Sequence, residues 1–146
     1  MVLNVDVAPS IVELCGLPPM KNIHGQSFVK LAAGQTTHWR DAWFYEYNYE
    51  KQFPYTPNVR GVRTDNWKYI HYPHGDGSPD RHQAELYNLK NDPEERHNLI
   101  ADPACAKTVA SLRQALEKQM QATGALPDKM PLDEGVKSEL PDAKIR

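Results

Sequence analysis

The sequence predicts an α+β fold, with a small antiparallel sheet of about four strands packed by a long C-terminal helix. Two observations predict it. Residues 43–72 contain runs in which apolar and polar side chains alternate, which is typical of half-buried strands. Residues 105–120 repeat apolar side chains every three or four positions, which is typical of an amphipathic helix. A sheet and a helix that each carry one apolar side are expected to form a two-layer domain.

Two short helices are expected before the sheet. Asp6 is placed to cap the first helix, which has an apolar stripe and ends at Gly16. The stripe consists of Ile11, Val12, Leu14 and Cys15. Ser27 is placed to cap the second helix, and Gly34 ends it. Two helices this short cannot bury their apolar stripes against each other alone, so they require a sheet or another domain to pack on.

The strands begin with residues 43–50, in which every odd position is aromatic. The aromatic block that continues to Tyr55 has two interpretations. Its side chains pack beneath a helix, or they stack on a sugar ring, and both hold if Phe53 and Tyr55 form an exposed lip. Residues 59–64 and 67–72 are expected to form a β-hairpin around Asp65-Asn66. A short strand is expected at 85–89, in a meander with the others.

The last helix has the clearest pattern in the sequence. Asp102 is expected at its cap and Pro103 at its first position, and Gly124 ends it. One face carries five apolar residues, Cys105, Val109, Leu112, Leu116 and Met120. Residues 125–146 mix Pro and charged residues with isolated apolar ones, so they are expected to form a loose tail.

Composition excludes several classes of function. The 146 residues carry a net charge of -2, which argues against a basic surface for nucleic acid. No apolar run approaches the roughly 18 residues of a membrane span, and the first residues lack the features of a signal peptide. Two cysteines make no disulfide framework. The residues alone contain no catalytic constellation: no metal-ligand spacing, phosphate loop or Gly-x-Ser-x-Gly elbow is present.

Five short segments, in order, resemble the C-terminal part of the type I sulfatases. They are Asp6-Val-Ala-Pro-Ser10 followed by Cys15-Gly16, His24-Gly-Gln-Ser-Phe28, Val62-Arg-Thr-Asp-Asn-Trp-Lys-Tyr-Ile70, Glu85-Leu-Tyr-Asn-Leu89, and Asp92-Pro-Glu-Glu95 followed by Asn98-Leu99. The resemblance covers roughly residues 5–120. Residues 49–57 are similar to the bacterial branch of N-acetylglucosamine-6-sulfatases and mucin-desulfating sulfatases.

This resemblance implies a division of the chain. Residues 1–41 correspond to the end of the family's α/β domain, 42–124 to its C-terminal subdomain, and 125–146 to the tail. The family's calcium ion and its formylglycine, made from a cysteine in Cys-x-Pro-x-Arg, belong to the part of the enzyme that precedes Asp6. The segment Cys15-Gly-Leu-Pro-Pro19 is not that motif. The resemblance therefore transfers no catalytic residue and no metal ligand, and it implies a missing N-terminal sulfatase domain as partner.

Residues that contact a sulfated sugar are the remaining expectation. The resemblance implies that loops of the C-terminal domain face the substrate, and the candidates are Tyr49, Phe53, Tyr55 and His71. The chain is then expected to support the enzyme and to form one wall of its pocket, without activity of its own. The alternative is a free-standing carbohydrate-binding or subunit-interaction module. Members of the family are often periplasmic or secreted, which is the expectation for the parent enzyme.

Overall fold

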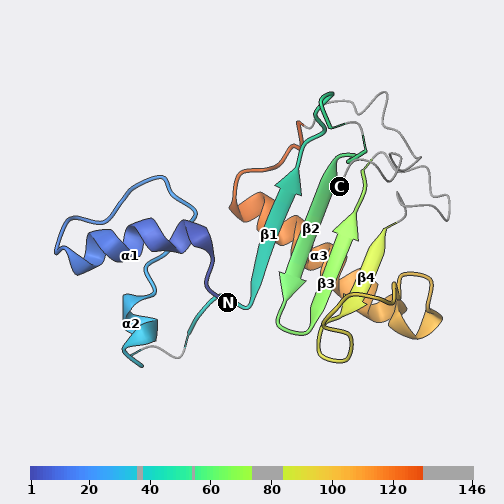
Figure 1. Cartoon of the computed structure of the whole chain (residues 1–146), viewed down its shortest axis with the longest axis horizontal. Helices are drawn as coiled ribbons and strands as arrows, with labels where there is room; N and C mark the ends of the chain where they lie inside the picture. Colours follow the sequence, from blue (N-terminus) through green and yellow to red (C-terminus); the bar gives the residue numbers. More distant parts are fainter. Residues whose placement is uncertain (36–37, 54, 74–83, 130–146) are drawn as a thin grey trace, which may run out of the picture. The chain divides into compact units, whose positions relative to one another are not determined.

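The computed structural model describes residues 1–35, 38–53, 55–73 and 84–129. The chain divides into two compact units, Met1–Asp41 and Ala42–Arg146. In the first unit, a 3-10 turn, η1 (Asn4–Asp6), leads directly into helix α1 (Val7–Leu14). A second helix, α2 (Val29–Ala32), follows after a long connection (Figure 1). Among the described helices, none has the length and apolarity needed to cross a bilayer.

Both helices of the first unit end near the predicted glycines. Gly16 has φ +66° and Gly34 has φ +68°, a left-handed conformation that glycine adopts without steric cost. The predicted apolar stripe of α1 is largely exposed in this unit, with Ile11 at 55% and Leu14 at 73% exposure. The unit therefore does not supply a surface that buries this stripe.

Asp6 has a different role from the predicted helix cap. It precedes α1 but makes no capping hydrogen bond to that helix. Its carboxylate is fully buried and accepts from both terminal nitrogens of Arg40, at 2.6 and 2.9 Å. The same oxygens accept from the main-chain N–H groups of Leu3 and Gln26, at 2.8 and 2.9 Å. The cap prediction was wrong because a buried carboxylate is most strongly stabilised by a paired guanidinium, and the paired guanidinium lies 34 residues away.

The second unit contains the predicted four-stranded antiparallel sheet. Its strands are β1 (Ala42–Tyr47), β2 (Val59–Thr64), β3 (Trp67–His71) and β4 (Glu85–Asn88). They are arranged in the order β1-β2-β3-β4, which confirms the predicted meander (Figure 1). The hairpin turns at Asp65-Asn66, where Trp67 N–H donates to the Thr64 hydroxyl at 3.0 Å.

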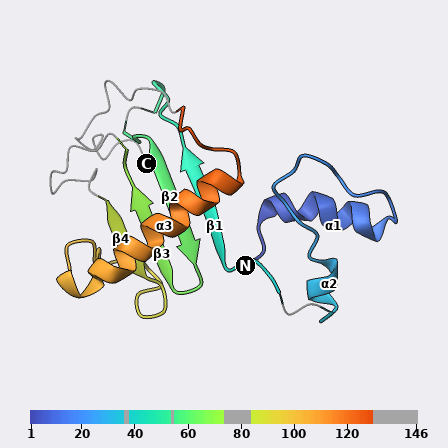
Figure 2. The same ribbon diagram turned by 180° about the vertical axis from the view of Figure 1, so that it is seen from behind.

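A long helix covers one face of this sheet. A 3-10 turn, η2 (Pro103–Cys105), is followed by α3 (Ala106–Ala122), and Figure 2 shows α3 crossing the strands. Ala104 N–H donates to the Asp102 carboxylate at 2.8 Å, as the capping pattern predicts. The helix buries Val109, Leu112, Leu116 and Met120 against a layer formed by Ala42, Val62, Tyr69 and Leu86. This core confirms the predicted fold class.

The odd-numbered aromatic residues of β1 lie on the face of the sheet that α3 does not cover. Strand pairing places Phe44 beside Val62 and Tyr45 beside Gly61. Because Val62 belongs to the core beneath α3, Phe44 faces the helix and Tyr45 faces away from it. Of the aromatic block, Phe44 therefore packs beneath α3, as one interpretation expected, whereas Tyr45 lies on the other face of the sheet. In this strand the even positions, Ala42 and Phe44, supply the contact with the core.

Candidate functional site

Residues 48–58 connect β1 to β2 and carry three of the four predicted substrate residues. The base of this loop is anchored by Asn58, which is fully buried. Its side-chain oxygen accepts from the Tyr49 N–H at 2.9 Å. Two turns follow, because Phe53 N–H donates to Glu50 O at 2.8 Å and Thr56 N–H donates to Phe53 O at 3.3 Å. The loop therefore has internal hydrogen bonds and a buried anchor.

Phe53 is the exposed aromatic residue of this loop, at 59% exposure. Tyr49 and Tyr55 are half-buried. Pro54, which separates Phe53 from Tyr55, lies outside the described residues. An aromatic ring offers a flat apolar face, and a tyrosine hydroxyl adds a hydrogen-bonding group at its rim. The loop thus presents side chains suited to contact a sugar ring.

His71 ends β3 and pairs with Arg60 of β2. It lines a hollow of about 190 Å³ together with Tyr69, Arg113, Leu116 and Glu117. Burial lowers the pKa of the His71 imidazole, and the positive charge of Arg113 lowers this pKa further. The imidazole is therefore neutral at pH 7, with one nitrogen able to donate and the other able to accept a hydrogen bond.

The four predicted residues lie at the same end of the sheet. In this antiparallel meander β1 and β3 run in the same direction, so the loop after β1 and the C-terminal end of β3 lie at the same end of the sheet. One strand separates them, which places β1 and β3 about 10 Å apart. His71 belongs to the face that α3 covers, and none of the three loop residues lines its hollow. The structure therefore places the loop and His71 as two neighbouring features.

Arg60 was missed by the sequence analysis. It lies in β2 at the same end of the sheet, and it is only 2% exposed. Its Nε and Nη2 atoms donate to the two carboxylate oxygens of Asp128, each at 2.8 Å. Nη2 also donates to Asn48 Oδ1 at 2.9 Å, and Nη1 donates to the carbonyl oxygens of Tyr47 and Val59 at 3.1 and 2.9 Å. No local pattern could reveal this pairing, because Asp128 is 68 residues from Arg60.

The face of the sheet opposite α3 carries a second polar cluster that the sequence analysis did not identify. The Tyr72 and Tyr87 hydroxyls each donate to a different oxygen of the Glu85 carboxylate, both at 2.6 Å. Burial raises the pKa of both hydroxyls, and the hydrogen bond to Glu85 raises it further. Both tyrosines therefore remain protonated donors at neutral pH, and Glu85 is held as an acceptor between them. The spacing of Glu85 and Tyr87 by two residues was the available signal, since it places both on one face of a strand.

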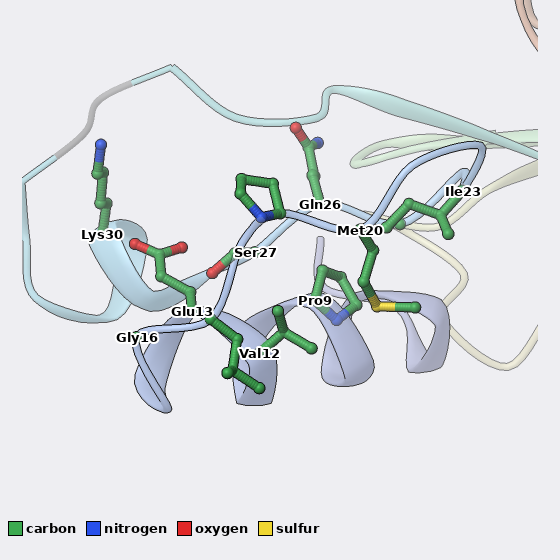
Figure 3. Close-up of a pocket in the computed structure, with 12 residues that line it drawn as sticks. Pro9, Val12, Glu13, Gly16, Met20, Ile23, Gln26, Ser27 and Lys30 are labelled. Atoms are coloured by element: carbon green, nitrogen blue, oxygen red, sulfur yellow. The ribbon is translucent and has the colours of Figure 1, made fainter.

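The first unit contains a larger hollow of about 670 Å³ (Figure 3). Figure 3 shows Pro9, Val12 and Glu13 of α1 on one side, with the returning chain on the other. The remaining lining residues are mostly small or apolar; they are Gly16, Leu17, Pro19, Met20, Ile23, Gly25, Gln26, Ser27 and Lys30. Of all the residues that line this hollow, Glu13 and Lys30 are the charged ones. This lining is suited to packing against other protein groups rather than to acid–base chemistry.

The resemblance implies calcium and formylglycine for the parent enzyme, and the described residues can be compared with the groups that these cofactors require. Among residues 1–35, 38–53, 55–73 and 84–129, no three His, Cys, Asp or Glu side chains gather as a metal site. Cys15 is exposed, and the motif that yields formylglycine is not present around it. We therefore derive no chemical step through calcium or formylglycine on this chain.

Comparison with known proteins adds the family context. The family model described as "N-sulphoglucosamine sulphohydrolase, C-terminal" matches residues 1–122. An N-acetylglucosamine-6-O-sulfatase of Bacteroides thetaiotaomicron is 33% identical over 122 residues, covering 80% of this chain and 20% of the relative. A delta 4,5-hexuronate-2-O-sulfatase of the same organism is 32% identical over 115 residues, covering 78% of this chain and 22% of the relative. The chain thus spans about a fifth of the length of these curated relatives.

Solved structures share the fold at similar coverage. A protein solved in complex with its substrate D-glucosamine-2-N,6-O-disulfate has a TM-score of 0.71 and 28% identity, covering 90% of this chain and 25% of that one. A sulfatase structure from Bacteroides thetaiotaomicron has a TM-score of 0.73 and 26% identity, covering 93% of this chain and 30% of that one. In both cases, most of the matched protein has no counterpart in these 146 residues.

Proposed function

Because this chain belongs to the family of sulfatase C-terminal domains, we propose that it is the C-terminal part of an enzyme that hydrolyses sulfate esters of a sulfated sugar resembling N-acetylglucosamine 6-sulfate. The carrying observation is the family match over residues 1–122 together with 33% identity to an N-acetylglucosamine-6-O-sulfatase. The chain supplies support and part of the substrate pocket, and the reacting groups belong to the catalytic domain.

The chemistry of sulfate esters supports this division of labour. Their hydrolysis requires a nucleophile, a cation that neutralises the sulfate oxygens, and an acid that protonates the leaving alcohol. The resemblance to the type I sulfatases implies that a formylglycine and a calcium ion supply the first two. By that resemblance both groups belong to the part of the enzyme that precedes Asp6, so we assign them to the catalytic domain.

The wall of the pocket is assigned to the loop at 48–58. Its hydrogen-bonded turns and its buried Asn58 anchor hold Phe53 outward at 59% exposure. A ring held in this way loses little conformational entropy when a sugar stacks on it. Tyr49 and Tyr55 supply further ring faces and hydroxyl groups, and the neutral His71 supplies a polar group at the same end of the sheet.

The exposed apolar residues of the first unit are assigned to contact with the catalytic domain. Eight large apolar side chains between Val2 and Ile23 have exposures of 38% or more, which is unusual for a free surface. By resemblance, this segment belongs to the end of the α/β domain. We expect the isolated chain to be marginally stable or to self-associate. A monodisperse monomer with a sharp thermal transition would contradict this assignment.

One set of measurements tests the proposal. The purified chain should release no sulfate from an aryl sulfate, with or without calcium, and turnover that depends on metal would overturn the division of labour. The reading frame upstream of the Met1 codon should encode Cys-x-Pro-x-Arg. An in-frame stop codon immediately upstream would instead favour the non-catalytic module.

Sugar binding tests the wall itself. N-acetylglucosamine 6-sulfate should bind the chain weakly and saturably, and Phe53→Ala and Tyr55→Ala should each weaken binding. Stacking contributes roughly 1 kcal/mol, so the loss is on the order of fivefold per ring. Phe28→Ala is the matched control, because it removes an aromatic ring from the first unit. Binding that is unchanged in both loop variants would contradict the assigned wall.

A further inference from the structure

Arg60 connects the candidate loop to a segment that lies far from it in the sequence. Residues 124–129, which follow α3, line a hollow of about 300 Å³ together with Glu46, Asn48 and Arg60. We call residues 124–129 the strap. The Arg60 side chain, only 3% exposed, holds the strap through both carboxylate oxygens of Asp128. The strap therefore lies against the end of the sheet at which the loop at 48–58 begins.

The hydrogen bonds of Arg60 account for all of its nitrogen atoms. Nε donates to Asp128, Nη2 donates to Asp128 and Asn48, and Nη1 donates to the Tyr47 and Val59 carbonyl oxygens. Glu46 adds a second carboxylate, with its Oε2 at 3.8 Å from Nε. A guanidinium saturated in this way is not available to bind a ligand, so its role must be to hold its neighbours in place.

These neighbours are the two ends of the candidate loop. Tyr47 is the last residue of β1, Asn48 is the first residue of the loop, and Val59 is the first residue of β2. Asn58, adjacent to Val59, accepts from the Tyr49 N–H at 2.9 Å. Arg60 thus contacts both sides of the loop base from a buried position. Its own orientation is set by Asp128, because a carboxylate that accepts two parallel bonds fixes the plane of the guanidinium.

We propose that Arg60 is a positioning residue for the sugar-contacting loop, and that Asp128 of the strap acts on the loop through it. Sugar affinity then depends on a carboxylate that does not belong to the loop. The statement about affinity rests on the proposed function, whereas the hold on the loop base stands on the geometry alone. The two parts are separated by measuring amide exchange and sugar binding on the same variants.

The test uses the full 146-residue chain, with variants at positions 128 and 48 and a control variant at position 94. Asp128→Asn removes the charge that holds Arg60, and Asp128→Glu restores a carboxylate. Asn48→Ala removes the hydrogen bond between Arg60 and the loop and leaves Asp128 in place. Because Asn48 is exposed, this variant is expected to fold even if Asp128→Asn does not. Glu94→Gln is the control, because its ion pair with Arg96 is 64% and 72% exposed.

Hydrogen exchange followed by mass spectrometry reports the hold on the loop. In Asp128→Asn we expect exchange on the order of tenfold faster in both the strap and residues 48–58, with recovery in Asp128→Glu. In Asn48→Ala we expect faster exchange in the loop and an unchanged strap. Glu94→Gln should leave both segments unchanged. Faster exchange in the strap alone in Asp128→Asn, or an unchanged loop in Asn48→Ala, would overturn the proposal.

Titration with N-acetylglucosamine 6-sulfate, with unsulfated N-acetylglucosamine beside it, reports the effect on affinity. Asp128→Asn should weaken binding on the order of tenfold, and Asp128→Glu should recover most of it, because a preorganised loop binds at lower entropic cost. Unchanged affinity with a loosened loop would overturn the positioning role. If the unaltered chain binds neither sugar, the assigned wall fails, while the exchange data still decide whether Arg60 holds the loop.

Discussion

Gly61 in the middle of β2 allows the aromatic ring of Tyr45 to lie across the sheet, and its replacement by alanine tests this arrangement. Strand pairing places Gly61 directly opposite Tyr45. A Cβ atom at position 61 would lie 2.2 Å from both Cε1 and Cζ of the Tyr45 ring, and 2.5 Å from its hydroxyl oxygen. Favourable carbon–carbon contacts are about 3.5–4.0 Å, so the ring must move by more than about 1 Å.

Movement of this ring disturbs its neighbours. Tyr45 packs against Trp43 with ring centroids 5.4 Å apart, and burial raises the pKa of its hydroxyl well above the usual range. Overpacking of this kind costs roughly 1–3 kcal/mol in the free energy of unfolding. Without the ring the same substitution should be neutral or stabilise the strand, by roughly 0.5–1 kcal/mol, because glycine weakens strand interiors.

A double-mutant cycle isolates the contact. Gly61→Ala is measured in the unaltered chain, in Tyr45→Ala and in Tyr45→Phe, by urea unfolding followed through the fluorescence of the three tryptophans, Trp39, Trp43 and Trp67. The cost should disappear in Tyr45→Ala and persist in Tyr45→Phe, which keeps the ring. If Gly61→Ala costs the same in all three backgrounds, within about 0.3 kcal/mol, the steric reasoning is refuted.

Three further predictions concern charge, core and loop. The Arg40 side chain lowers the pKa of the Asp6 carboxyl from 3.8 to about 2. This corresponds to roughly 2 kcal/mol that stabilises the first unit above about pH 4 and is lost as the pH falls to about 2, as an NMR acid titration should show. Leu112→Ala should cost roughly 2–5 kcal/mol in urea unfolding, because Leu112 is 5% exposed beneath the sheet; the exposed neighbour variant Gln114→Ala should change little. Asn58→Ala removes the acceptor of a loop N–H and should cost roughly 1–3 kcal/mol; an unchanged midpoint would show that water replaces this acceptor.

Much of the second unit was predictable because its signals are local. The helix at Ala106–Ala122 follows from apolar spacing along one segment and from the Asp102 cap, both readable within a few turns of chain. The hairpin follows from Asp65-Asn66 between two strand patterns. The order of strands in the meander follows from the general tendency of sequential strands to pair with each other.

The face of β1 that packs beneath α3 was not predictable from alternation. Both sets of alternate positions contain aromatic residues, because Phe44 lies between Trp43 and Tyr45. The choice depends on which residues of β2 the strand meets, and Val62 rather than Gly61 supplies an apolar side chain to the core. A strand with two apolar faces leaves this choice to its neighbours.

The candidate loop was identified from its aromatic residues, but the groups that hold it were not. Tyr49, Phe53 and Tyr55 stand out in the sequence, whereas Asn58 and Arg60 look like ordinary polar residues of a loop end and a strand. Their importance comes from burial and from partners brought together by the fold.

The sequence by itself determined the family, the order of helices and strands, and the set of aromatic residues at one end of the sheet, because motifs, spacings and capping residues act over short stretches of chain. The tertiary structure decided which face of the sheet α3 covers. It also decided that Asp6 pairs with Arg40 and that Arg60 pairs with Asp128. Buried charges must find opposite charges, and those partners, 34 and 68 residues away, are brought into reach only by the folded chain.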